Sequence, residues 1–152
     1  PLLGGCYAFQ ENKIEKFPVK SKAKGLTDRH LVYIYIKLPN NHILLHKRHP
    51  GDIWAGLYEP LLFEFPTPPT DNQILEKLSA IPDLLVSTLR LAAKGVRHNL
   101  THRRLWIDFW IAESSHNVNL PGFIEISESL RDTKAAPQII KKIYSSLETS
   151  TP

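Results

Sequence analysis

The chain lacks most features that mark secreted or membrane proteins. Its 152 residues include no methionine and a single cysteine, Cys6. One cysteine cannot form an internal disulfide, which argues against a secreted, disulfide-stapled scaffold and favours a reducing, cytoplasmic compartment. The sequence also has no run of about eighteen apolar residues, the length that a membrane-spanning helix requires. These absences leave a protein that folds in water.

The N-terminus also lacks the signals of a complete or exported chain. It starts at Pro1 without an initiator methionine and without the positively charged start of a signal peptide. We therefore expect the chain to be a part of a longer protein.

The composition is that of a globular domain with an excess of positive charge. Hydrophobic residues make up 42% and charged residues 22% of a length that suits one domain with a genuine core. The net charge is +4 and the isoelectric point is near 9.2. Such a balance favours an anionic partner, although many basic proteins have none.

The first half of the domain is predicted to contain a hairpin and a helix. Residues 1–30 show no sustained period and form a Lys-rich connector. Residues 31–37 are apolar on both alternate faces, as in a central strand, and Pro39–Asn41 provides a turn into a second strand over 42–48. A third apolar run covers 57–65. Thr70 and Gln73 have capping-box spacing before a helix. Its apolar stripe would comprise Ile74, Leu75, Leu78 and Ile81.

The second half is predicted to contain a longer hairpin and a final helix. Residues 84–94 are ambiguous between strand and helix, whereas 104–111 alternate as a strand. Pairing of 95–100 with that strand would put Thr101 and His102 at a hairpin tip. A short strand covers 123–126, and Pro137 begins a helix. Its apolar face would comprise Ile139, Ile140, Ile143, Tyr144 and Leu147. The order predicts an α+β domain over residues 31–150, with a mixed, mostly antiparallel sheet packed by about two helices.

Three segments together resemble the C-terminal domain of MutY-type adenine DNA glycosylases. Gly51-Asp-Ile-Trp-Ala-Gly-Leu-Tyr-Glu59 is similar to that family's G-x-W-x-G-L-Y-x-F-P pattern. Val96-Arg-His-Asn-Leu-Thr-His102 is similar to its H-x-F-S-H stretch. The start, Pro1-Leu-Leu-Gly-Gly-Cys-Tyr-Ala8, resembles the end of its iron–sulfur cysteine loop. The segments occur in the family's order, and the resemblance covers nearly the whole chain.

This resemblance implies both a fold and a role. The family's C-terminal domain has a Nudix-like (MutT-like) fold and recognises 8-oxoguanine opposite adenine in double-stranded DNA during base excision repair. The parent enzyme, a bacterial nucleoid-associated glycosylase, would excise the adenine with an N-terminal catalytic domain that precedes Pro1. Cys6 would be the last ligand of a [4Fe-4S] cluster in that parent. One thiolate cannot hold a cluster that needs four, so we expect Cys6 to be a free thiol here, with no cofactor and no catalytic residue in this chain.

Recognition of the lesion needs a hydrogen-bond acceptor. Oxidation at C8 turns N7 of guanine from an acceptor into an N–H donor and adds an acceptor oxygen, so arginine or lysine would favour the undamaged base. The Thr101 hydroxyl can accept and its backbone N–H can donate, while the His102 ring can donate to a phosphate or a base edge. Leu100 stands where the family usually has Phe. It would act as a smaller apolar wedge between bases.

Structural interpretations of the same residues compete with these roles. Leu100 could simply pack in the core, and Thr101 with His102 could be a polar turn. However, Thr-His lacks the Asn-Gly or Asp-Gly chemistry of a two-residue hairpin turn, which favours a functional loop.

The basic residues have a functional and a structural interpretation as well. Phosphate contacts are expected from Arg97, Arg103 and Arg104 beside the tip, and from the alternating Lys20, Lys22 and Lys24 in the connector. Solvated surface and a merely soluble linker are the alternatives. Among the aromatic residues, Trp54 and Tyr58 are expected to anchor a packed loop, and a helix is expected to cover Trp106 and Trp110.

A metal site is not expected at the histidines. The chain has seven, and His98 and His102 have i, i+4 spacing, but that spacing brings two ligands together only on a helix, whereas the local pattern is strand and turn.

Two other functions compete with lesion recognition. A Nudix pyrophosphohydrolase needs the carboxylates of a G-x5-E-x7-R-E-x2-E-E signature to hold Mg²⁺, and no R-E-x2-E-E occurs here. A protein-interaction module could use residues 18–30 as a docking strip for a repair or replication protein, and this function could coexist with DNA recognition. Salt dependence would separate the two, because phosphate contacts weaken steeply with added salt.

Overall fold

The computed structural model describes residues 27–150, so the predictions for Cys6, Lys20, Lys22 and Lys24 lie outside it. The described strands are β1 (Thr27–Leu38), β2 (His42–Lys47), β3 (Tyr58–Glu59), β4 (Leu61–Phe65), β5 (Val86–Asn99), β6 (Arg103–Ser114) and β7 (Phe123–Ser127). The α-helices are α2 (Asp71–Ser79) and α3 (Gln138–Ser150), and short 3-10 turns cover Pro39–Asn41 and Glu128–Thr133. None of the helices in this range is long and apolar enough to cross a membrane.

The strands form one mixed sheet, as the sequence predicts. The main order is β3-β2-β1-β6-β5, with β4 paired to β1 and β7 paired to β2. β1 and β6 run parallel, and the other pairs are antiparallel. The parallel pairing begins at Thr27 opposite Arg103, so β1 takes in the last four residues of the segment 1–30 that was expected to be connector.

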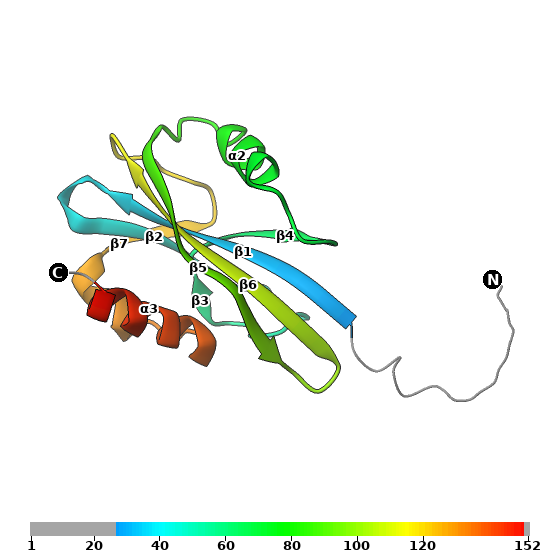
Figure 1. The fold of residues 1–152 in the computed structure, drawn as a ribbon. Coiled ribbons are helices and arrows are strands. Elements are labelled where there is room, and N and C mark those ends of the chain that lie inside the picture. Colours follow the sequence, from blue (N-terminus) through cyan, green and yellow to red (C-terminus); the bar gives the residue numbers. More distant parts are fainter. Residues whose placement is uncertain (1–26, 151–152) are drawn as a thin grey trace, which may run out of the picture.

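The two helices lie on opposite faces of the sheet (Figure 1), which we call the α2 face and the α3 face. Alternation along β1 supplies both faces, because successive side chains point to opposite sides of a strand. Leu31, Tyr33 and Tyr35 pack in the cluster that α3 covers. Val32, Ile34 and Ile36 pack in the cluster that α2 covers. β1 is therefore the central strand that its apolar run predicts.

The predicted helix start at Thr70 is confirmed, but its apolar stripe is narrower than expected. The Thr70 hydroxyl accepts from the Gln73 N–H at 3.2 Å, and the Gln73 side chain accepts from the Thr70 N–H at 2.9 Å. Ile74 and Leu78 are buried, whereas Leu75 is 48% exposed. Ile81, the fourth predicted member of the stripe, lies beyond the end of α2 at Ser79 and packs partly buried against the same cluster.

The ambiguity over residues 84–94 is resolved in favour of strand. β5 runs from Val86 to Asn99 and pairs with β6 over its whole length, although its register shifts at three places. The second hairpin therefore forms as predicted, with residues 100–102 between its strands. We call these three residues the hairpin tip.

Candidate nucleic-acid interface at the hairpin tip

The backbone of the hairpin tip is held from two sides while two of its side chains are exposed. The Leu100 N–H donates to the Arg103 carbonyl at 2.7 Å, which closes the hairpin. From β1, the Thr27 N–H donates to the His102 carbonyl at 3.2 Å, and the Thr27 hydroxyl donates to the same oxygen at 3.5 Å. Thr101 and His102 are both exposed. The tip therefore presents a hydroxyl and an imidazole on an anchored backbone.

Leu100 lies differently from its two neighbours. It is half-buried and packs against the cluster on the α3 face. A side chain in that position contributes apolar burial to the domain, and it would have to leave the cluster to insert between bases. The position of Leu100 thus favours the core-packing interpretation over the wedge.

The three arginines near the tip differ in how fully their charges are paired. Nε of Arg104 donates to Asp28 at 2.7 Å, and this hydrogen bond lowers the pKa of Asp28 and raises that of Arg104. Nη1 of Arg103 lies 3.7 Å from Oδ1 of Asp52. Arg97 is exposed, and within residues 27–150 no carboxylate lies within ion-pair distance of it. Among these three arginines, Arg97 has the most available charge.

Asp52 connects the loop 51–57, which precedes β3, to the strands behind the tip. Its carboxylate accepts two hydrogen bonds from Arg29, at 2.9 and 3.1 Å, and one from Arg48. The Arg29 hydrogen bonds, together with the Ile53 N–H and the charges of both arginines, hold the pKa of Asp52 well below its ordinary value, against the opposing effect of partial burial. Asp52 is therefore ionised at neutral pH, and it fixes the loop close to Arg103.

A buried ionic network lies behind this loop. Nη1 of Arg48 donates to both Glu59 oxygens, and the hydroxyl of Tyr33 donates to the same carboxylate at 2.8 Å. Nε2 of His46 lies 3.0 Å from Glu59. Burial of the Tyr33 hydroxyl and the nearby Glu59 charge raise its pKa well above the ordinary value. The sequence pattern does not predict this network, and its only signal there is a glutamate within the apolar run 57–65.

Two carboxylates that follow the loop 51–57, those of Glu59 and Glu64, are paired with arginines. Glu59 is bound by Arg48, and Glu64 accepts from Arg29 at 2.6 and 2.7 Å. Within residues 27–150, no three histidine, cysteine, aspartate or glutamate side chains gather in an arrangement that could hold a metal ion. His98 lies on β5, where its ring faces Trp54 with centroids 6.0 Å apart.

Three of the four aromatic residues lie as predicted, and Trp106 does not. Trp54 and Tyr58 are half-buried against the cluster on the α3 face, as expected of loop anchors. Trp110 packs in the cluster under α2. The expectation that a helix covers Trp106 is wrong, because Trp106 lines an open cavity on the α2 face. Alternation assigns a side chain to a face of the sheet, but α2 spans only Asp71–Ser79 and covers the Trp110 end.

Comparison with known proteins identifies the fold. A family model described as the NUDIX domain matches residues 32–145. The C-terminal domain of mouse MUTYH, solved in complex with human PCNA, has a TM-score of 0.59 at 15% identity, covering 80% of this chain and 88% of that one. The E. coli ORF135 protein has a TM-score of 0.58 at 16% identity, covering 84% and 95%. A MutT structure from a study of the Aliivibrio salmonicida and Vibrio cholerae proteins has a TM-score of 0.55 at 13% identity, covering 79% and 99%.

These structural likenesses show a shared fold. Among curated proteins, none matches.

Proposed function

Because the chain belongs to the NUDIX domain family, whose model matches residues 32–145, we propose that it uses this fold to read a lesion in DNA. The lesion is 8-oxoguanine opposite adenine, and the chain is the recognition domain of an A/G-specific adenine DNA glycosylase. The proposal joins the fold to the resemblance of three sequence segments to that enzyme family.

The observation that carries the proposal is the hairpin tip. Thr101 and His102 are exposed on a backbone that Thr27 and Arg103 hold in place. Preorganised polar groups bind with a smaller loss of conformational freedom than mobile ones. The tip is thus suited to hydrogen bonding with a base edge or a phosphate.

The chemistry of Thr101 distinguishes the oxidised base from the intact one. Its hydroxyl can accept from the N7–H of 8-oxoguanine, whereas N7 of guanine has no hydrogen to donate. Its backbone N–H forms no hydrogen bond within residues 27–150 and can donate to the new oxygen at C8. His102 adds a ring donor, and Arg97 adds a charge for a flanking phosphate.

Adenine excision is assigned to the parent enzyme rather than to this chain. The family's cluster needs four thiolates, and this sequence has one cysteine, so the residues here do not fit a [4Fe-4S] group. We expect the chain alone to bind the lesion weakly, since phosphate contacts and base extrusion would be shared with the catalytic domain. We also expect it to leave adenine in place, since the resemblance assigns excision to that domain.

A protein-interaction module is the second candidate, and it is compatible with the first. The mouse domain of the same fold was solved with human PCNA, which favours a repair or replication protein as a partner. The docking strip that we expect, residues 18–30, lies mostly outside the described residues.

The test is a titration of the chain against two duplexes, one with 8-oxoguanine opposite adenine and the other with guanine at the same position. Fluorescence anisotropy measures the binding. The chain should prefer the lesion, and a Thr101→Ala, His102→Ala variant should lose about 1–3 kcal/mol of that preference. Thr88→Ala, an exposed substitution far from the tip on β5, should keep it. If duplex binding depends neither on salt nor on the tip substitutions, the protein-interaction module is favoured over lesion recognition.

A further inference from the structure

A groove on the α2 face lies between α2 and the first half of β5, away from the hairpin tip (Figure 1). Its volume is about 460 Å³, and its walls are Leu75, Leu78 and Ser79 on one side and residues 84–89 on the other. Within residues 27–150 four large hydrophobic side chains are exposed, and two of them, Leu75 and Leu85, line this groove. Clustered exposed apolar side chains are typical of interaction surfaces.

Leu91 extends this apolar surface along β5. It pairs with Trp110, Leu89 pairs with Ala112, and both β6 residues pack in the cluster under α2. Because residues paired across an antiparallel ladder share a face of the sheet, Leu89 and Leu91 follow one another on the α2 face. Leu91 is the third of the four exposed leucines. The apolar surface therefore continues from the groove along the strand.

The outer edge of β5 is open beside this groove. β5 is the last strand on its side of the sheet, and in the described part of the chain it pairs only with β6. Residues 88–91 pair with residues 110–113 in regular register, between two register shifts. The outward N–H and C=O groups of such an edge are a template for a further strand. An added strand would hydrogen bond to β5 while its alternate side chains enter the groove.

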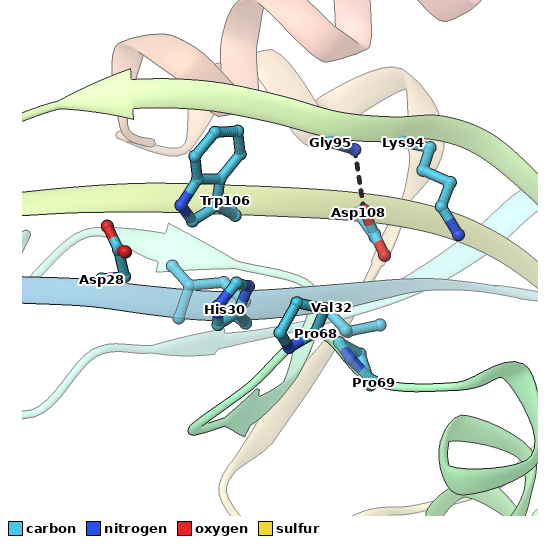
Figure 2. Close-up of a pocket in the computed structure, with 10 residues that line it drawn as sticks. Asp28, His30, Val32, Pro68, Pro69, Lys94, Gly95, Trp106 and Asp108 are labelled. Carbon is cyan, nitrogen blue, oxygen red and sulfur yellow. Dashed lines mark hydrogen bonds between the residues drawn. The ribbon is translucent and has the colours of Figure 1, made fainter.

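The charge of β5 determines which strand this edge favours. Its 14 residues include Arg90, Lys94 and Arg97 and no acidic residue. All three cations are exposed, and within residues 27–150 no carboxylate lies within ion-pair distance of them. Figure 2 shows Lys94 on the same face of the sheet as Trp106 and Asp108, which is the α2 face. An added strand therefore meets apolar groups along the first half of β5 and positive charge along the second.

These charges disfavour two occupants from the chain itself. A second copy that paired edge to edge through β5 would bring two rows of cations together, and like charges opposite each other destabilise a sheet. Residues 1–26 carry five lysines and two glutamates, so that segment has the same sign of charge as β5. An acidic strand from another protein meets neither conflict.

We propose that β5 and the groove beside α2 bind an extended segment of a partner protein in which apolar residues adjoin acidic ones. The segment adds to the open edge of β5, with its apolar side chains against the three exposed leucines and its acidic side chains near the β5 cations. Main-chain hydrogen bonds provide affinity, and the groove and the charges provide selectivity. This inference does not rest on the proposed function, since it uses no residue of the hairpin tip.

The test uses a fluorescein-labelled synthetic peptide as the probe, titrated with the full 152-residue chain and followed by fluorescence anisotropy. The acidic probe, Glu-Thr-Glu-Thr-Val-Thr-Ile-Thr-Val, has strand propensity and the residue order for antiparallel addition to β5. A second probe has the reverse order, for parallel addition. One control peptide has lysine in place of both glutamates. Another has proline in place of the two central threonines, which removes N–H donors that a strand needs.

The protein variants test the groove and the charges separately. Leu75→Gln with Leu85→Gln changes side chains that are already exposed, so the fold should survive while affinity for the acidic probe falls about tenfold or more. Leu130→Gln, at the fourth exposed leucine and outside the groove, is the matched control. Lys94→Glu should weaken binding of the acidic probe and strengthen binding of the lysine peptide. Lys141→Glu, at an exposed position on α3, should change neither.

Amide hydrogen exchange shows whether the probe adds as a strand. Saturable binding of the acidic probe in one of its two orders, slower exchange within residues 86–91 and the expected losses in the variants support the inference. Lack of binding in both orders, equal binding of the lysine or the proline peptide, or full binding by the L75Q/L85Q variant overturns it.

Two further outcomes would assign the surface to a different occupant and overturn the inference. One is tighter binding of a single-stranded oligonucleotide than of the acidic probe, with the same loss in the L75Q/L85Q variant. The other is dimerisation of the chain in sedimentation experiments that this variant abolishes. The L75Q/L85Q variant should leave lesion-duplex binding unchanged, so this inference and the proposed function can fail separately.

Discussion

Arg48 and Glu59 form an ion pair inside the domain, with one guanidinium nitrogen 3.1 and 2.9 Å from the two carboxylate oxygens. Their side chains are 7% and 0% exposed. Nε of the same arginine donates to the Ile53 carbonyl at 2.9 Å. The pair therefore fixes the loop 51–57 against β2 and β3, and through Asp52 it also holds the loop near Arg103.

Removing one member of this pair should strongly destabilise the fold. Glu59→Gln leaves the Arg48 charge buried without a counter-charge, and such changes cost about 3–5 kcal/mol. Urea denaturation at pH 7 measures the loss. Glu125→Gln, which affects an exposed contact with His42, is the control and should cost less than about 1 kcal/mol. If both substitutions lower the free energy of unfolding equally, the buried pair stabilises the fold no more than the exposed contact does.

The Asp52 contacts should make stability depend on acid pH. The folded-state pKa of Asp52 lies below its ordinary value of 3.8, so its contribution is present above that value and is lost as the pH falls through the folded-state pKa. The difference in urea midpoint between wild type and Asp52→Asn should be constant from about pH 7 to 5 and should narrow below about pH 4. A difference that persists unchanged down to about pH 2 would contradict this assignment.

The capping box at α2 provides a local stability test. Thr70→Ala removes the side-chain acceptor for the Gln73 N–H, which should cost about 1 kcal/mol. The nearby exposed Thr67 forms no side-chain hydrogen bond within residues 27–150, so Thr67→Ala should cost much less. Thermal or urea unfolding of the two variants makes the comparison. Equal losses would mean that the cap contributes little to this short helix.

Arg97 should contribute more to DNA binding than its paired neighbour Arg104. If Arg97 contacts a phosphate, Arg97→Gln should reduce the slope of log affinity against log salt by about one. Arg104→Gln should change the slope less, since Asp28 already balances that charge. Arg90→Gln, at an exposed position farther along β5, is the control. The prediction fails if the slope is the same for Arg97→Gln and for wild type.

Patterns within one segment were sufficient to predict most of the secondary structure. The apolar residues of 31–37 predict a two-faced central strand, and the alternation over 104–111 predicts β6 and the hairpin tip. The strand at 84–94 was ambiguous because the register shifts near Ala93 interrupt the alternation that would have marked it.

The remaining features depend on contacts between distant segments. Glu59 could be seen as an acidic residue in an apolar run, but Tyr33, which also binds it, lies 26 positions away. The cavity beside Trp106 is open because α2 does not extend over that part of the sheet. The sequence of β6 does not predict the extent of α2. Likewise, Leu100 packs against the cluster on the α3 face, and the tip sequence alone allowed either role.

The central claim is that the Thr101 hydroxyl accepts a hydrogen bond from N7–H of the oxidised base. The direct test is a thermodynamic cycle with two proteins and two duplexes. Wild type and Thr101→Val are each titrated with a duplex that contains 8-oxoguanine opposite adenine and with one that contains its 7-deaza analogue. In the analogue, a C–H replaces the N7–H and cannot donate in the same way. Wild type should bind the 7-deaza duplex more weakly by about 1–3 kcal/mol, and Thr101→Val should bind the two duplexes equally. If the valine variant keeps the full wild-type preference for the N–H, the hydroxyl does not read the lesion and the account is wrong.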